Sequence, residues 1–233
     1  MNPTTFSAEL LQYYRDYLID WIPRLIAGVR VTAELSVLGF ALALLLGALL
    51  AAGTMSRHRA LRTPATAFVQ VMRAIPLLAL LLSLYFGLPP LGITLSGFGA
   101  GVLGLGLGGS AYVAEIIRGS LNALHRGQRE AALAAGMTPF AALRHILLPQ
   151  AARGMLPPLV ITFVSLLKDS SLCALIATDE LMLAAKAIAS ESFQPLQIFL
   201  LVGLFYFIVA WPLSMLARVL ERRMGRDLRR VGN

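Results

Sequence analysis

The sequence predicts an all-α protein, a helical bundle that crosses a membrane about five times. Apolar residues make up 58% of its 233 residues and charged residues only 14%, against roughly 25% charged residues in soluble globular domains. Five apolar stretches each reach the length of about 20 residues that a helix needs to cross a bilayer. The expected spans are residues 27–53, 65–87, 97–117, 154–178 and 196–218.

The basic residues predict how these spans are oriented. The net charge is +8, but the arginines gather beside the ends of the apolar spans, so we exclude nucleic acid as a partner. The segments after spans one, three and five are rich in arginine, whereas residues 88–96 and 179–195 share a single lysine. Basic residues mark the cytoplasmic side, which predicts an outer N-terminus and a cytoplasmic C-terminus. Arg15, Arg24 and Arg30 on the outer side oppose this orientation.

Three regions follow along the chain. Residues 1–26 interleave charges with aromatic side chains that favour the membrane–water boundary, namely Tyr13, Tyr14, Tyr17 and Trp21. We expect this segment to form an interfacial helix beside the first span. Residues 27–222 form the predicted transmembrane domain, and residues 223–233 form a basic cytoplasmic tail.

Glycine spacing in the third span predicts close helix packing. Gly97 and Gly101, and again Gly104 and Gly108, stand four residues apart. Small residues at this spacing let helix backbones approach one another closely within a membrane. In the second span, Pro76 can interrupt the helical hydrogen bonds.

The fourth span contains charged residues, which are costly inside a bilayer and therefore need a reason. Lys168 and Asp169 fall past the midplane, toward the outer face. Neighbouring residues point about 100° apart on a helix, so at least one of them faces the bundle, a water-filled path or a partner chain. With Ser170 and Ser171 they are candidates for a substrate pathway, and a structural charge network is the alternative.

The third span has its own polar pair. Tyr112 and Glu115 lie one turn apart and share a face, and both are candidates for the pathway. Glu115 also precedes Arg118 by three residues, a spacing that allows an ion pair within one helix. A gate or a structural salt bridge is therefore the favoured role for Glu115. Arg73 in the second span is expected to extend toward the interface.

Residues 127–154, between spans three and four, are too polar to cross a membrane and predict two short helices. Residues 128–135 are rich in helix formers, and Gly136 is a suitable left-handed stop. Thr138 can cap the next helix, with Pro139 at its first position. That helix is expected over residues 140–147, with Pro149 closing it.

The second of these helices has an apolar ridge. Phe140, Leu143 and Leu147 recur at helical spacing, with Arg144 and His145 on other faces. Such a helix can offer its ridge to a partner protein or rest on lipid headgroups. The sequence contains no G-x-x-x-x-G-K-[ST] phosphate-binding loop, so any ATP that drives the protein is expected on another subunit.

The loop carries a resemblance to a known family. Glu130-Ala131-Ala132, Gly136 six positions later and Leu148-Pro149 resemble the EAA loop of ABC importer permeases. In that family this loop supplies the coupling helix that docks on the ATPase subunit. The resemblance implies an ATPase-coupling role for Glu130, Ala131, Ala132, Gly136, Thr138, Pro139, Phe140, Leu143 and Pro149.

Further motifs place the resemblance within the polar amino acid permeases of the histidine, glutamine and arginine type, over residues 25–222. Two departures stand out: Ala74 follows Arg73 where the family usually has glycine, and Gly108 stands where it often has asparagine. The motifs, in the order seen in that family, are RAIPLL (73–78), YFGLP (85–89), SAYVAEIIRG (110–119), RGQREAA (126–132), LPQA (148–151), LPP (156–158) and LKDSSL (167–172).

The resemblance implies a type I ABC importer permease in the inner (plasma) membrane of a bacterium. Its expected partners are a second permease chain, identical or homologous, two ATPase subunits, an extracytoplasmic solute-binding protein and membrane lipid. ATP and Mg are expected on the ATPase, and no cofactor on this chain. No catalytic residues or metal ligands are expected, since His58, His125 and His145 lack metal-ligand spacing.

Three alternatives stay open. An ABC permease for another small solute shares every feature above except the amino acid motifs. A secondary transporter or channel would need no ATPase, and internal inverted repeats would favour it, but the sequence shows none. A membrane-bound enzyme would need a catalytic cluster, which the sequence does not supply.

Overall fold

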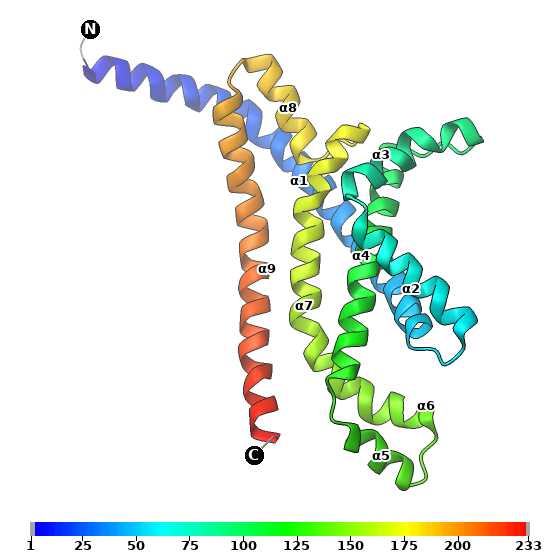
Figure 1. The fold of residues 1–233 in the computed structure, drawn as a ribbon. Helices are drawn as coiled ribbons and strands as arrows, with labels where there is room; N and C mark the ends of the chain where they lie inside the picture. The colour runs from blue at the N-terminus through cyan, green and yellow to red at the C-terminus, as the bar shows by residue number, and fades with distance from the viewer. Residues whose placement is uncertain (1–2, 232–233) are drawn as a thin grey trace.

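The computed structural model describes the backbone of residues 3–231 and the side chains of residues 17–223. Helices account for nearly all of this backbone, which confirms the all-α prediction (Figure 1). Short 3₁₀ turns occupy Pro89–Leu91 and Ser170–Ile176, and a π-helical turn occupies Leu143–Leu147. The α-helices in chain order are α1 (Pro3–Thr54), α2 (Arg59–Ala74), α3 (Leu77–Gly87), α4 (Gly97–Asn122), α5 (Arg126–Ala134), α6 (Pro139–Ala142), α7 (Leu148–Asp169), α8 (Leu181–Ser192) and α9 (Pro195–Val231).

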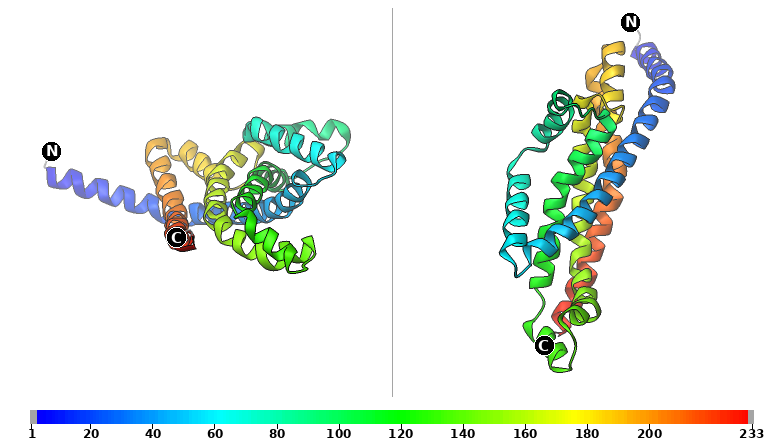
Figure 2. Two further views of the ribbon diagram at one scale, coloured as in Figure 1. Left: turned by 60° about the horizontal axis from the view of Figure 1, so that its bottom comes forward. Right: turned by 90° about the vertical axis from the view of Figure 1, so that its right-hand side faces the viewer.

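The prediction of about five spans agrees with this fold. Within the described residues, four helical stretches are long and apolar enough to cross a membrane, and α2 with α3 adds a fifth if the bent pair counts as one span. The four are Tyr17–Thr54, Gly97–Asn122, Pro139–Ile176 and Pro195–Arg223. α8 lies at the end of the bundle where α1 begins, while α5 and α6 project beyond the opposite end, toward which α9 also runs (Figures 1 and 2).

The predicted second span, residues 65–87, is not a straight helix. α2 and α3 meet at a break of 102°. Ile75 takes extended backbone angles, φ −81° and ψ 129°, as residues before a proline prefer. Pro76 has no N–H with which to continue the helical ladder. The proline therefore turns the predicted span into two helices that point in different directions.

The N-terminal segment does not form a helix separate from the first span, as residues 1–26 were expected to do. α1 continues through Pro23 without interruption. Trp21 is buried, and it packs with Leu25 in a cluster completed by residues of α8 and α9. Trp21 therefore serves helix packing, whereas the sequence predicted a place at the membrane–water boundary. Tyr13 and Tyr14 lie outside the residues whose side chains are described.

Helix α4 lies at the centre of the bundle, against α1, α2, α3 and α7. The glycines of α4 let its backbone approach these neighbours closely, as the glycine spacing predicted. A Cβ at Gly97 would stand 2.1 Å from the Ile176 carbonyl oxygen, and one at Gly104 would stand 2.5 Å from Leu81 Cδ2. At Gly101 and Gly108 the nearest atoms would be 3.0 and 3.3 Å away.

Substitution of Gly97 by alanine is expected to destabilise the bundle by about 1–3 kcal/mol, the usual cost of overpacking, because a backbone oxygen cannot move aside as a side chain can. Gly119→Ala is the matched control in the same helix. A Cβ there meets nothing within 4 Å, and alanine is the better helix former by about 1 kcal/mol. The melting temperature of the detergent-solubilised chain should fall for the first variant and not for the second. Equal melting temperatures would contradict the close approach at Gly97.

Candidate functional site

The 127–154 loop folds as two helices joined by a tight turn. After α5 the backbone turns at Gly136, where φ is +81°. The Gly136 N–H donates to the Leu133 carbonyl at 3.0 Å, and the Met137 N–H donates to the Ala132 carbonyl at 3.1 Å. This pair of bonds is the Schellman motif, which needs a left-handed residue at the position that Gly136 fills. The predicted left-handed stop is confirmed.

The second helix of the loop begins as predicted. The Thr138 hydroxyl accepts the Ala141 N–H at 3.2 Å, and Pro139 is the first residue of α6. The side chain of Thr138 thus satisfies an N–H that has no partner within the helix. The cap and the proline both fix the direction in which the chain enters α6. The sequence therefore determines where this helix starts.

Pro149 does not close this helix, contrary to the prediction. The chain passes from α6 through the π-helical turn Leu143–Leu147 directly into α7, where Pro149 is the second residue. The Leu148 N–H bonds to the Leu143 carbonyl five residues earlier. This wider turn lets the helix continue past a residue that offers no N–H.

The loop presents part of the predicted ridge to the outside, since its third member, Leu147, is only partly exposed. Phe140 is 69% exposed and Leu143 is 37% exposed. Glu130 and Ala131 on α5 are exposed as well, whereas Ala132 is buried. An exposed apolar ridge with charged neighbours at one end of the bundle is suited to contact with another protein.

A pocket of about 480 Å³ opens where the break between α2 and α3 faces α4 and α7. Tyr112, Lys168 and Asp169 line it, as the pathway prediction required. Ligand pockets commonly have volumes of this order, with a few polar groups on an apolar wall. The full polar lining is Tyr112, Thr162, Ser165, Lys168 and Asp169, beside Gly108 and Gly109.

The two serines after Asp169 do not line this pocket. Ser170 is buried, and its hydroxyl donates to the Leu167 carbonyl at 2.8 Å. The Ser171 hydroxyl donates to the Lys168 carbonyl at 2.8 Å. Both hydroxyls therefore satisfy backbone carbonyls in the last turn of α7, and the structure does not bring them to the candidate pathway.

Glu115 forms a charged cluster beside the pocket instead of lining it. Its carboxylate accepts two bonds from Arg118, at 2.6 and 3.0 Å, which confirms the predicted intrahelical pair. Arg73 approaches the same carboxylate at 3.8 Å, and its guanidinium lies 6.0 Å from the centre of the Tyr112 ring. Arg73 was expected to extend toward the interface. Its attraction to Glu115 ties α2 to α4 instead.

Sequence reasoning missed Glu180, a fully buried carboxylate. Its two oxygens accept the Met182 and Leu183 N–H groups, both at 2.9 Å, and so cap α8. The Tyr206 hydroxyl donates to it at 3.1 Å from α9, and the Thr32 hydroxyl donates at 3.4 Å from α1. Glu180 therefore joins three helices at one point.

A sequence signal for this site exists. Glu180 stands directly before the apolar run that begins at Leu181, in the position of a helix N-cap. Thr32 stands among apolar residues of the first span. The pairing of the two cannot be read from the sequence, because they are 148 residues apart.

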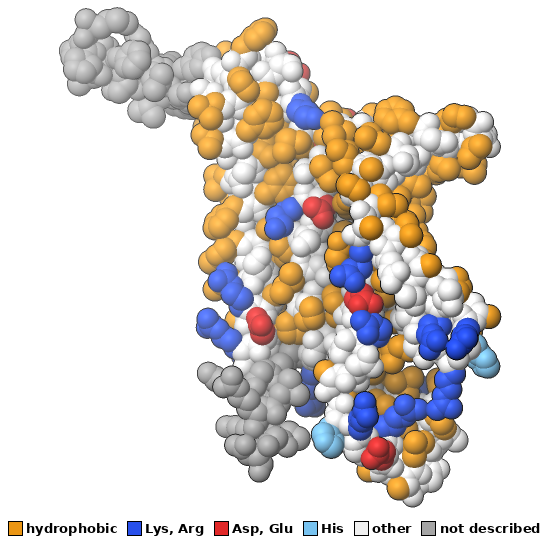
Figure 3. Space-filling model, viewed as in Figure 1, with side chains coloured by type: hydrophobic (Ala, Val, Ile, Leu, Met, Phe, Trp, Pro, Cys, Tyr) orange, Lys and Arg blue, Asp and Glu red, His pale blue; other side chains and the backbone are white. Residues whose placement is uncertain are grey.

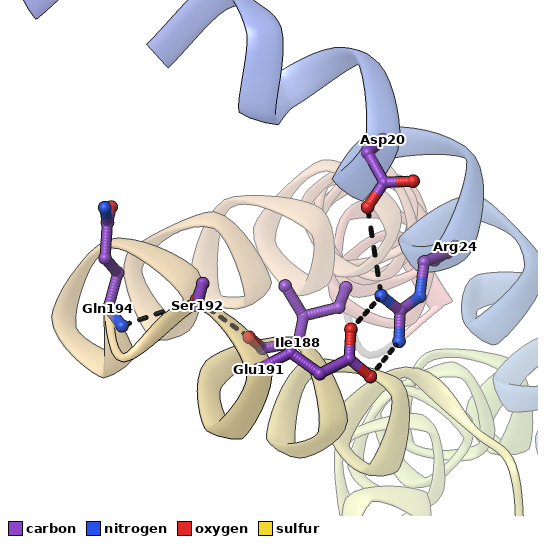
Figure 4. Close-up of polar contacts among 6 residues, drawn as sticks. All are labelled: Asp20, Arg24, Ile188, Glu191, Ser192 and Gln194. Carbon is purple, nitrogen blue, oxygen red and sulfur yellow. Dashed lines mark hydrogen bonds and ion pairs between the residues drawn. The ribbon is translucent and has the colours of Figure 1, made fainter. Parts of the chain in front are cut away.

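Figure 4 shows how Arg24 is paired. It donates to both oxygens of Glu191 on α8, at 2.5 and 2.8 Å, and lies 3.9 Å from Asp20. These bonds hold the pKa of Glu191 below its ordinary value. Arg30 likewise donates to Glu34 at 2.8 Å. Two of the three arginines that opposed the predicted orientation are thus neutralised by carboxylates.

Beside this pair, the side chain of Ser192 bonds to backbone groups at the C-terminal end of α8. The Ser192 hydroxyl donates to the Ile188 carbonyl at 2.7 Å and accepts the Gln194 N–H at 3.3 Å (Figure 4).

Among the described residues no group of three or more His, Cys, Asp or Glu side chains could hold a metal ion.

Residues 43–226 match the family described as "Binding-protein-dependent transport system inner membrane component". The chain is 37% identical to the glutamine transport system permease protein GlnP of Escherichia coli (strain K12), over 90% of this chain and 97% of that protein. It is 36% identical to the L-cystine transport system permease protein TcyB of Bacillus subtilis (strain 168), over 88% of each.

Among solved structures, the crystal structure of an amino acid ABC transporter with histidines superposes with a TM-score of 0.84. Its sequence is 34% identical, and the match covers 89% of this chain and 97% of that chain. These similarities extend over nearly the full length of the chain, and they confirm the resemblance to ABC importer permeases. The chain belongs to the family of binding-protein-dependent transport system inner membrane components.

Proposed function

We propose that the chain is the membrane-spanning permease subunit of an ATP-binding cassette importer that takes up polar amino acids. The observation that carries the substrate class is the pocket between α4 and α7, where Lys168 and Asp169 bring opposite charges to one cavity. A free amino acid is a zwitterion, so an ammonium and a carboxylate in one pocket complement its two ends. Relatives whose names include glutamine and cystine support the same class.

The chain is a transport component and not an enzyme, since its family is one of inner membrane components of transport systems. Family membership implies ATPase and binding-protein partners. We propose two ATPase subunits, which bind ATP and Mg, and an extracytoplasmic protein that delivers the ligand. A second permease chain, identical or homologous, would complete the pathway, because the pocket is open on one side of the bundle.

The proposed location is the inner membrane of a bacterium, with the 127–154 loop in the cytoplasm. The arginines that follow α1 and α4, and those in the C-terminal part of α9, support this orientation. The chain would then begin outside and end in the cytoplasm.

The exposed ridge around Phe140 is the proposed contact with the ATPase. When ATP closes the two ATPase subunits, the loops of the two permease chains would move together. Since α6 continues into α7 through a helical turn, movement of the loop would tilt α7, which carries Lys168 and Asp169. The pathway would open outward as the binding protein releases its ligand.

Reconstitution tests the function directly. The chain, its ATPase and its binding protein in proteoliposomes should take up amino acids only when ATP is present, and the ligand is identified by which amino acid stabilises the binding protein against heat. Uptake by this chain alone, driven by an ion gradient, would instead identify a secondary transporter. A binding protein stabilised only by sugars or metal ions would refute the amino acid assignment.

Removing either charge from the pocket is expected to lower uptake about tenfold or more, equivalent to about 1.4 kcal/mol of lost interaction. Lys168→Met and Asp169→Asn test the two ends of the ligand separately. Ser171→Ala is the control, because that hydroxyl bonds the backbone and does not line the pocket. If the charged variants lose thermal stability but keep the KM for uptake, the pair is structural.

A further inference from the structure

A second hollow lies between the ends of α1 and α4 and the start of α7, and its volume is about 1000 Å³. Its walls are mainly apolar. Small residues of α1 form one side, so the space is wide enough for a chain-like apolar ligand. The apolar walls include Ala48 and Ala52 of α1, Leu121 of α4, and Phe140, Leu143 and Leu147 of the 127–154 loop.

The polar lining of this groove carries positive charge. Arg126, Arg129 and His125 line it, together with Asn122, and no carboxylate does. Within residues 17–223 neither arginine has an ion pair. His125 Nδ1 accepts the Gly127 N–H at 3.1 Å, so Nε2 is the ring nitrogen that carries a proton and can donate it to an anion.

The groove stands at the level where two spans end. The apolar stretch of α1 ends at Thr54 and that of α4 ends at Asn122, and residues from the last turns of both line the groove. Basic side chains gather over the lower part of the molecule, whereas the upper part is largely apolar (Figure 3). The groove therefore crosses the boundary between the bilayer core and its headgroups.

We propose that this groove binds an anionic phospholipid. An acyl chain lies along Ala48 and Ala52 of α1, and the phosphate bonds to Arg126, Arg129 and His125. Basic pockets beside membrane spans on the cytoplasmic side are suited to acidic lipid headgroups. The proposal rests on the placement of the chain in a membrane and not on its cargo.

Phe140 and Leu143 on one wall of the groove belong to the ridge proposed to contact the ATPase, whereas the wall formed by α1 fits a lipid better. Ala48 and Ala52 lie inside the candidate span Tyr17–Thr54, where a water-soluble subunit would have to enter the bilayer to reach them. A lipid already occupies that depth. The absence of a carboxylate from the lining also favours an anion over a mixed protein surface.

Retention of phosphatidylglycerol tests the proposal, measured by native mass spectrometry on the purified full-length chain. Phosphatidylglycerol should bind more tightly than phosphatidylcholine. The double variant Arg126→Ala/Arg129→Ala should weaken the binding of phosphatidylglycerol about 25-fold, the product of about fivefold for each arginine. Arg222→Ala/Arg223→Ala is the control of equal charge, because these exposed arginines of α9 do not line the groove.

A groove-filling variant separates a lipid from a free phosphate ion. Ala48→Trp replaces an exposed alanine of the wall, and it should displace phosphatidylglycerol while leaving inorganic phosphate binding unchanged. Three results would each overturn the proposal. The chain could bind the two lipids with equal affinity, the control variant Arg222→Ala/Arg223→Ala could lose as much phosphatidylglycerol affinity as the test variant, or Ala48→Trp could leave phosphatidylglycerol binding unchanged. So would a full complex that retains no phosphatidylglycerol, since the ATPase would then cover the groove.

Discussion

Replacing Gly136 with valine is expected to uncouple the importer, so that uptake falls at least tenfold while the chain still inserts in the membrane. Gly136 has φ +81°, a conformation that costs a residue with a Cβ about 1–2 kcal/mol and is especially unfavourable for a β-branched side chain. A Cβ at this position would meet nothing within 4 Å. Any effect of the substitution therefore acts through the backbone turn.

That turn sets the angle between α5 and α6. If valine forces it to open, the Gly136 and Met137 N–H bonds to α5 are lost, and the ridge at Phe140 changes direction. The ATPase would then no longer drive α7. The measurement is uptake together with ATP hydrolysis in proteoliposomes, in which ATP hydrolysis should cease to respond to the loaded binding protein.

Gly136→Asn is the matched control, because asparagine tolerates the left-handed conformation. It should keep most of the uptake, and Gly136→Asp then adds only a negative charge to the same turn. Glu130→Lys tests the exposed face of α5 by reversing its charge. Undiminished uptake by both Gly136→Val and Glu130→Lys would refute a role for the loop in coupling.

The sequence was most informative where short-range chemistry decides the structure. The stop at Gly136, the cap at Thr138 and the Glu115–Arg118 pair each depend on residues within five positions of one another, and all three are confirmed. The close packing at Gly97 was also predicted, because a small-residue spacing is visible in the sequence without knowledge of the partner helix.

Prolines were harder to interpret, because their effect depends on the backbone around them. Pro76 breaks its span by 102°, whereas Pro149 and Pro23 stand inside continuous helices. At Pro149 a π-helical turn accommodates the missing N–H. Sequence alone identifies the missing donor, but it does not indicate whether the chain bends or the helix widens.

Long-range polar pairs could not be predicted. Arg73 was expected at the interface, yet it turns to Glu115 on another helix. Ser170 and Ser171 were grouped with Lys168 and Asp169 because they adjoin them, but the helix tightens into a 3₁₀ turn after Asp169 and directs the hydroxyls to the backbone. The contacts around Glu180 depend on three helices meeting, which a single sequence does not reveal.

Removing the carboxylate at Glu180 should therefore destabilise the end of the bundle where α8 meets α1 and α9, by about 3–8 kcal/mol. Glu180→Ala removes the cap of α8, worth about 0.5–2 kcal/mol, and leaves the buried hydroxyls of Thr32 and Tyr206 without this acceptor, at about 1–3 kcal/mol each. The melting temperature of the detergent-solubilised chain measures the loss.

Two further variants locate the effect. Glu180→Gln keeps the size of the side chain and one acceptor oxygen, so its melting temperature should lie between those of the wild type and Glu180→Ala. Glu191→Ala removes a carboxylate from the same helix, but that side chain is 60% exposed, and exposed ion pairs contribute little. If Glu180→Ala and Glu191→Ala melt alike, burial of Glu180 does not hold α8 to α1 and α9. If Glu180→Ala alone melts early, the contact between these three helices depends on one buried carboxylate.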